Sequence, residues 1–296
     1  MPPSLLSSVA AVAFATALVA APTAAAGKNS TAAHAPFGTI KSKPGECVVG
    51  DPNTYISPKD LQWIWDNRMK SDVESLDNWA MDHIVANKGT LNYCVRWDSQ
   101  TISLTKENAK KIETMLNRQY AAWNHWLIGY DCWPYDEIKV NIVGWAGRKA
   151  SDFEWSDDSL GKIYIGDLDQ NGVPQCPQNC YRTPDGSGGW SESSGCEGEP
   201  FDISVWPTEG MTSGLGKYDF QQYGLEIVLE HMEEEQFYFA IHETGHSFGL
   251  PNFYEMPQPP NFKPCVMWAL SSMTMKDTDG WMIRRVLENK KHKYDF

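Results

Sequence analysis

The sequence has no excess of basic residues and, after its first 26 residues, no long apolar run. Lys and Arg total 25 against 38 Asp and Glu, which gives a formal net charge of −13. Such a charge repels nucleic acids and anionic membranes, so we expect neither as a partner. No later stretch reaches the roughly 18 apolar residues that a transmembrane helix requires. Internal repeats are also lacking.

The N-terminus has the pattern of a secretory signal. Residues 1–26 combine an uncharged start, the apolar run VAAVAFATALVAA and small residues that suit cleavage near Ala26. The start lacks the usual positive charge, and a retained membrane anchor is the alternative. Residues 27–56 are expected to be a disordered lead-in or pro-segment, with a glycosylation acceptor at Asn29. Residues 57–296 then form one domain, and the protein is expected to be secreted.

Seven cysteines fit this oxidising destination. Their spacing does not match a zinc finger, so disulfides are expected. The number is odd, which leaves at least one thiol free or bonded elsewhere. Cys47 is expected to pair, for example with Cys94; its alternative role is a thiolate that inhibits a metal site. The cysteines are Cys47, Cys94, Cys132, Cys176, Cys180, Cys196 and Cys265.

The order of apolar patterns predicts an α+β fold. Residues 106–127 carry apolar side chains at a 3.6-residue spacing, which indicates a long amphipathic helix. Ser57 followed by Pro58 is typical of a helix start, and helix is expected from there to Gly89 in two segments. Further strands are expected at 91–97, 137–146, 161–166 and 201–207, and further helices after residue 235 and at 278–290. The Cys- and Gly-rich loop 167–199 is expected to be held by disulfides.

The most informative segment is HETGHSFGLPN, from His242 to Asn252. Residues four apart share one face of an α-helix, so His242 and His246 can offer two ring nitrogens to one metal ion. Glu243 lies beside them and is suited to act as a general base. Gly249 can adopt a positive φ, which would turn the chain back towards the metal. An ordinary pair of buried histidines is the competing interpretation.

This motif resembles that of the metzincin clan of zinc metallopeptidases, H-E-x-x-H-x-x-G-x-x-H/D followed by a methionine turn. The chain is most similar to the snapalysin type, over residues 237 to about 285. The resemblance implies a twisted mixed sheet, Zn²⁺ bound by His242 and His246, Glu243 as general base, and Met267 beneath the ligands. It also implies that Tyr254 stabilises the reaction intermediate, although packing is an equally good role for this tyrosine. The expected partner is a protein or peptide substrate, and the protein is expected to be a monomer.

Asn252 departs from that pattern, because the clan has His or Asp at this position. An asparagine amide is a neutral and weaker oxygen ligand for zinc. Three explanations remain open: Asn252 binds through its carbonyl oxygen, Glu255 replaces it, or the protein is a catalytically impaired relative. The last explanation corresponds to an extracellular binding protein with the same fold, for example one that binds polysaccharide.

Two weaker patterns remain. Asp167, Asp169 and Asn171 precede a glycine, like the first half of a calcium loop, but the closing glutamate of an EF-hand is missing. A plain polar turn is favoured over Ca²⁺ binding. The chain also has 13 tryptophans; an exposed row of them could stack on sugar rings, but core packing is the default expectation.

Overall fold

A computed structural model of the chain describes residues 44–52, 54–253 and 258–296. The predicted signal peptide, Asn29, Tyr254 and Glu255 lie outside these residues. Within the described ranges, no helix is long and apolar enough to cross a membrane.

The described residues form a six-stranded sheet with helices, which confirms the predicted α+β class. The strand order is β3-β2-β1-β4-β6-β5; all neighbours are parallel except β5 and β6, so the sheet is mixed, as expected. The strands are β1 (Thr90–Arg96), β2 (Lys139–Gly147), β3 (Lys162–Ile165), β4 (Ile203–Thr208), β5 (Gly214–Gly216) and β6 (Phe220–Gly224). The α-helices are α1 (Pro58–Ile64), α2 (Lys70–Ser75), α3 (Ala80–Ala86), α4 (Lys106–Asn124), α5 (Leu225–His231), α6 (Tyr238–Ser247) and α7 (Asp277–Lys290).

Most of these elements lie close to where the sequence predicts them. Ser57 caps α1 by accepting a hydrogen bond from the amide of Asp60, and Pro58 is its first residue. A π-helical turn, Trp65–Met69, separates α1 from α2. The elements β5, β6 and α5 were not predicted. Gly-Leu-Gly in β5 and Phe-Gln-Gln-Tyr-Gly in β6 lack the regular apolar alternation that identifies a half-buried strand.

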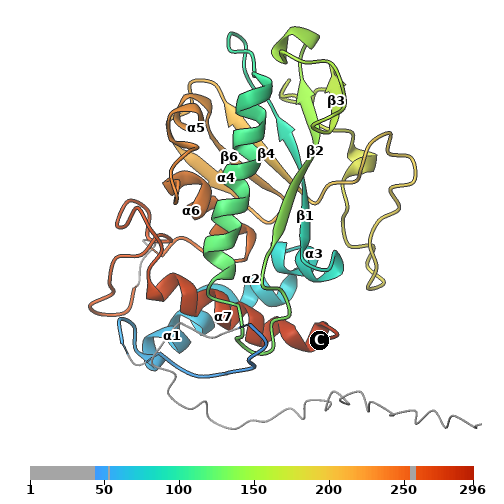
Figure 1. Ribbon diagram of the computed structural model, residues 1–296. Helices are drawn as coiled ribbons and strands as arrows, with labels where there is room; N and C mark the ends of the chain where they lie inside the picture. Colours follow the sequence, from blue (N-terminus) through green and yellow to red (C-terminus); the bar gives the residue numbers. More distant parts are fainter. Residues whose placement is uncertain (1–43, 53, 254–257) are drawn as a thin grey trace, which may run out of the picture. The chain divides into compact units, whose positions relative to one another are not determined.

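The two faces of the sheet differ in what covers them. Helices α4 and α6 lie side by side on one face (Figure 1). The main core lies there, and it includes Tyr93, Val95, Ile203 and Val205 of the central strands. Successive strand residues point to opposite faces, so Cys94 of β1 and Val143 and Ala146 of β2 point away from α4. They contact the loop that follows β3, in a second, smaller apolar cluster.

Three disulfides join Cys47 to Cys132, Cys94 to Cys176 and Cys180 to Cys196. The suggested pair Cys47–Cys94 is wrong. Val48 pairs with Tyr130, which brings Cys47 beside Cys132, whereas Cys94 points into the loop-covered face. Cys265 is the free, buried thiol that the odd number predicts. The loop is disulfide-bonded, as expected, and Cys47 is not available as an inhibitory thiolate.

Several tryptophans pack in the core. Trp65, Trp123 and Trp126 are buried, as the packing interpretation predicts. Trp63 and Trp190 are partly buried.

Candidate metal centre

Helix α6 carries the histidine motif and is attached to the rest of the core by side-chain hydrogen bonds. The indole of Trp123 in α4 donates to the carbonyl of Ile241 at 3.0 Å. The amide of Gln221 in β6 donates both to Ser247 of α6 (3.1 Å) and to Tyr93 of β1 (3.0 Å). Two strands and a helix thus hold α6 in place, so its side chains have little freedom to reorient.

The two imidazoles lie close together and nearly perpendicular to each other, and backbone carbonyls set their ring orientations. Nδ1 of His242 lies 2.7 Å from the carbonyl of Val266, and Nδ1 of His246 lies 2.7 Å from that of Leu250. A carbonyl only accepts, so each Nδ1 carries the proton and each Nε2 presents a lone pair. The ring centroids are 4.8 Å apart. This is the ring orientation that histidine ligands of a metal adopt.

The chain turn after α6 supplies one of these carbonyls. Gly249 has φ +90°, and the amide of Leu250 donates to the carbonyl of Gly245 at 3.1 Å. This is a Schellman ending, which glycine adopts without steric strain. The turn brings the carbonyl of Leu250 back onto the ring of His246. The prediction that Gly249 reverses the chain is confirmed.

Asn252 follows the turn and lies at the two histidines. Its Oδ1 is 3.0 Å from Nε2 of His242; with the proton of that ring on Nδ1, both atoms are acceptors, as two ligands of one cation are. Arg68 donates to its backbone carbonyl at 3.3 Å, and the neighbouring Phe253 amide donates to the carbonyl of Met267 at 2.8 Å. The amide oxygen of Asn252 therefore lies beside Nε2 of His242 and the imidazole of His246, where a third metal ligand would be needed.

Glu243 is almost completely buried, with a residue exposure of 3%. Oε2 has no hydrogen-bond partner among the described residues and lies 3.8 Å from Nε2 of His246. Burial raises the pKa of Glu243 to about 8. The same burial lowers the pKa of His242, and lowers that of His246 to about 4 with a further contribution from His242. The 3.8 Å contact is therefore not an ion pair at neutral pH, because both groups favour their uncharged forms without a cation.

The edge strand β5 closes over this carboxylate. A Cβ placed on Gly214 would be 2.1 Å from Oε1 of Glu243, and one on Gly216 would be 2.8 Å from Oε2. Only glycine permits this approach of the backbone. No local sequence pattern marks these two glycines, because their role depends on a strand that contacts a helix distant in sequence.

Met267 packs against α6; its role as a metzincin methionine turn stays a prediction. It is fully buried, and a Cβ on Gly245 would be 2.3 Å from its Sδ. The thioether thus contacts α6 at Gly245, a residue that lies between His242 and His246 in the sequence.

Asp279 in α7 holds the turn that contains Met267. Its carboxylate accepts from the amides of Val266 (3.0 Å) and Met267 (3.1 Å), and from that of Lys276 (2.7 Å). Full burial raises the pKa of Asp279 to about 6. Lys276 is the N-cap residue of α7, and Asp279 caps the helix by accepting from the Lys276 amide. Asp279 also positions the carbonyl that orients His242, which the sequence patterns did not reveal.

The other predicted site residues lie elsewhere. Asp169 accepts hydrogen bonds from the amides of Asn171 and Val173 and pairs with Arg96, while Asp167 accepts from the side chain of Gln175. These residues form the polar turn that was favoured, and Ca²⁺ binding there stays a prediction.

Among the described residues, His242, Glu243 and His246 form a group that could hold a metal ion; their ligand atoms lie within 4.8 Å of one another. Comparison with known proteins adds no identification: no family model, no curated protein and no solved structure matches the chain.

Proposed function

We propose that the protein is a secreted zinc metallopeptidase of the metzincin type. The observation that carries this proposal is the pair of imidazoles whose Nδ1 atoms are both bound to carbonyls, so that both Nε2 lone pairs converge beside a buried glutamate. If the two histidines served only packing, there would be no reason for their Nε2 atoms to lie close together. The signal-like residues 1–26 and three disulfides support secretion.

The donor set favours zinc. Two neutral imidazoles and one oxygen match the three protein ligands of catalytic zinc sites. His242, His246 and Asn252 would hold the ion. When bound, it would supply a Lewis acid that polarises a substrate carbonyl and lowers the pKa of a water molecule.

Glu243 is suited to move the proton in this reaction. It would accept a proton from the attacking water and pass it to the leaving amine, which requires a carboxylate with a pKa near the working pH. Burial already places the pKa of Glu243 at about 8 in the metal-free chain. A neighbouring cation would lower that value and favour the basic form.

The edge strand β5 supports a peptide as substrate. It is paired only with β6 in the sheet order, and its Leu215 is 49% exposed. An open strand edge binds an extended peptide through backbone hydrogen bonds. Because β5 contacts Glu243, a peptide held along it would have its backbone close to the proposed base.

Metal analysis and proteolysis test the proposal together. The purified protein should contain about one Zn²⁺ per chain and hydrolyse casein, with activity lost in a chelator and restored by zinc. Glu243→Gln should keep the metal and lose at least about a hundredfold in activity, the contribution expected of a general base. Glu230→Gln, at an exposed carboxylate, is the matched control and should change neither. Full activity in the Glu243 variant would refute the assignment.

The second candidate is a binding protein that retains the site without turnover. Asn252 at the third-ligand position and the 3% exposure of Glu243 favour it. Stoichiometric zinc without any hydrolysis of casein would support this candidate over the peptidase.

A further inference from the structure

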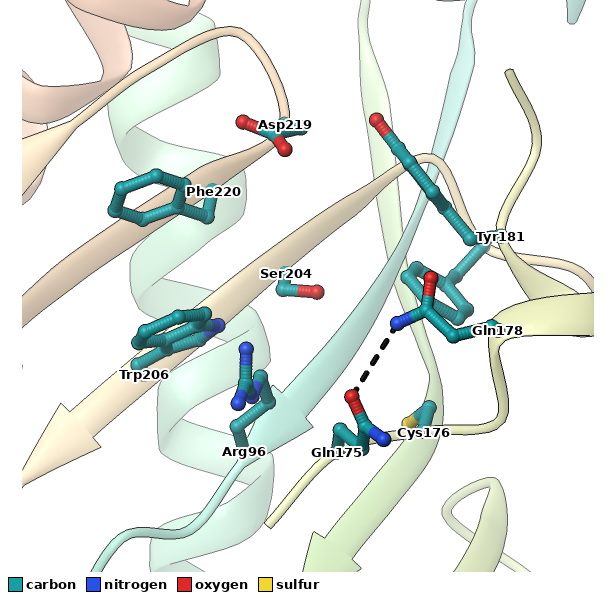
Figure 2. A pocket seen from close by; sticks show the side chains of 10 residues that line it. Arg96, Gln175, Cys176, Gln178, Tyr181, Ser204, Trp206, Asp219 and Phe220 are labelled. Carbon is teal, nitrogen blue, oxygen red and sulfur yellow. Dashed lines mark hydrogen bonds between the residues drawn. The ribbon is translucent and has the colours of Figure 1, made fainter. Parts of the chain in front are cut away.

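A separate cavity lies on the face of the sheet opposite α4 and α6. Its volume is about 110 Å³, and Ser204 of β4 forms its floor (Figure 2). Ser204 and Trp206 alternate along β4 with Ile203 and Val205, which belong to the main core beneath α4. No ligand candidate of the metal centre lines this cavity.

Two stacked aromatic pairs form opposite walls. Trp206 and Phe220 lie with ring centroids 5.0 Å apart, and Tyr181 and Phe201 with centroids 5.4 Å apart. The disulfide Cys94–Cys176 joins the loop side of the cavity to β1. The walls are therefore built before any ligand arrives, as in most small-molecule sites.

The polar side chains that line this cavity include Ser204, Asp219 and the amides of Gln175 and Gln178. The carboxylate of Asp219 has no side-chain donor within the described residues, and burial raises its pKa. A ligand that donates a hydrogen bond to Asp219 would therefore gain from that contact. The indole nitrogen of Trp206 has no exposed surface, so its N–H is not offered to a ligand.

The charges around the cavity disfavour an ionic ligand. Arg96 lies 3.5 Å above the ring of Trp206, but its charge is compensated by Asp169, and its Nε donates to the carbonyl of Pro174 at 2.6 Å. An anion would meet Asp219, and a cation would meet Arg96. A neutral molecule avoids both repulsions.

We propose that this cavity binds one sugar unit of a neutral saccharide. The hydroxyl groups of a sugar can donate to the carboxylate of Asp219, and the C–H groups of the ring suit aromatic walls. The cavity is small, so it would take a single ring rather than a folded peptide segment. The proposal is independent of the metal centre.

Titration of the full-length secreted protein with neutral oligosaccharides tests the proposal. The probes are cellohexaose, xylohexaose, maltohexaose and N-acetylchitohexaose, followed by calorimetry and by tryptophan fluorescence. At least one should bind with 1:1 stoichiometry and a Kd of about 1 mM or tighter. Glu243→Gln should bind the same probe equally well.

Three variants locate the binding. Asp219→Asn should weaken it by at least about tenfold, because a hydrogen bond to a carboxylate is lost. Ser204→Leu should abolish it by filling the floor of the cavity, whereas Ser204→Ala should leave it within about threefold. Asp157→Asn is the matched control, at an exposed carboxylate that pairs with Lys106 outside the cavity. Thermal unfolding confirms that each variant is folded; if Ser204→Leu is not, Asp219→Asn decides.

Two results would overturn the proposal. The first is an absence of binding by all four oligosaccharides, or binding that persists unchanged in Asp219→Asn and in folded Ser204→Leu. The second is that the zwitterion L-phenylalanine binds in the cavity while none of the saccharides does, which would identify a site for free amino acids.

Discussion

The protonation states at the metal centre follow from desolvation of single side chains. His242 and His246 favour the neutral, ligating form, and Glu243 favours the acid form until a positive charge arrives. A buried carboxyl that is easily neutralised lets the metal-free chain fold without an unpaired charge. In the proposed peptidase, the same carboxyl would become a base when a cation is bound.

Removing the charge of Glu243 should stabilise the metal-free protein at alkaline pH. The pKa is 4.5 ordinarily and about 8 in the folded chain, so between these values the unfolded chain releases a proton that the folded chain retains. Stability is therefore lost as the pH rises from 4.5 through 8. Glu243→Gln should be more stable than the parent by roughly 2–4 kcal/mol at pH 8 and equal to it below pH 4.5.

Urea unfolding in a chelator, at pH 4 and pH 8, measures this difference. Glu230→Gln, whose carboxylate is exposed, controls for the loss of one negative charge. A difference of the same size at both pH values would show that burial of Glu243 is not the cause.

The identity of the third ligand should be visible in metal affinity. If Asn252 binds through Oδ1, which lies 3.0 Å from Nε2 of His242, an anionic oxygen at the same place will bind zinc more tightly. Asn252→Asp should raise the affinity by at least about tenfold, and Asn252→Ala should lower it by a similar factor. Competition with a fluorescent chelator measures both. An unchanged affinity in Asn252→Ala would instead direct attention to Glu255.

Helix α6 is constrained by side chains that pack against its middle, at Gly245. Glycine in the middle of a helix ordinarily costs stability, so replacement by alanine usually helps by up to about 1 kcal/mol. At Gly245 the new methyl group would be 2.3 Å from Sδ of Met267 and 2.8 Å from the ring of Trp123. Because of this packing, replacing Gly245 by alanine should destabilise the protein instead of stabilising it.

Gly245→Ala should destabilise the protein by roughly 1–3 kcal/mol, the typical cost of overpacking a core. Differential scanning calorimetry measures the decrease in the unfolding temperature. Gly195→Ala is the control, because its methyl group would meet only the end of the Asn179 side chain, at 3.3 Å. A stabilised Gly245 variant would mean that Met267 moves aside without cost.

For the molecule as a whole, the disulfides differ in how much chain they close. Cys94–Cys176 spans 82 residues and joins the loop to the central sheet, whereas Cys180–Cys196 spans 16 within the loop. Closing a longer segment restricts the unfolded chain more. Replacing both cysteines of the longer span by alanine should cost roughly 1–2 kcal/mol more than the same change in the shorter span.

Equilibrium urea unfolding of the two double variants gives this comparison. Each variant removes one buried or partly buried disulfide from the same loop, so they serve as controls for each other. A larger loss for the shorter span would show that native packing, rather than chain entropy, dominates.

The sequence sufficed for features that depend on near neighbours. The spacing of His242, Glu243 and His246 within one helix, the reversal at Gly249 and most elements of the α+β order follow from periodicity and local backbone preference. Asn252 was identified only through the resemblance to the metzincin motif, which places its third ligand within a few residues of that turn.

Contacts between distant segments were decided only by the tertiary structure. The carbonyl of Val266 that orients His242, the carboxylate of Asp279 that holds it, and the β5 glycines against Glu243 come together through packing of separate elements. The cavity at Ser204 likewise requires a sheet and a disulfide-bonded loop to meet. A local sequence pattern does not predict these long-range contacts, because they form when the chain buries apolar surface on both faces of one sheet.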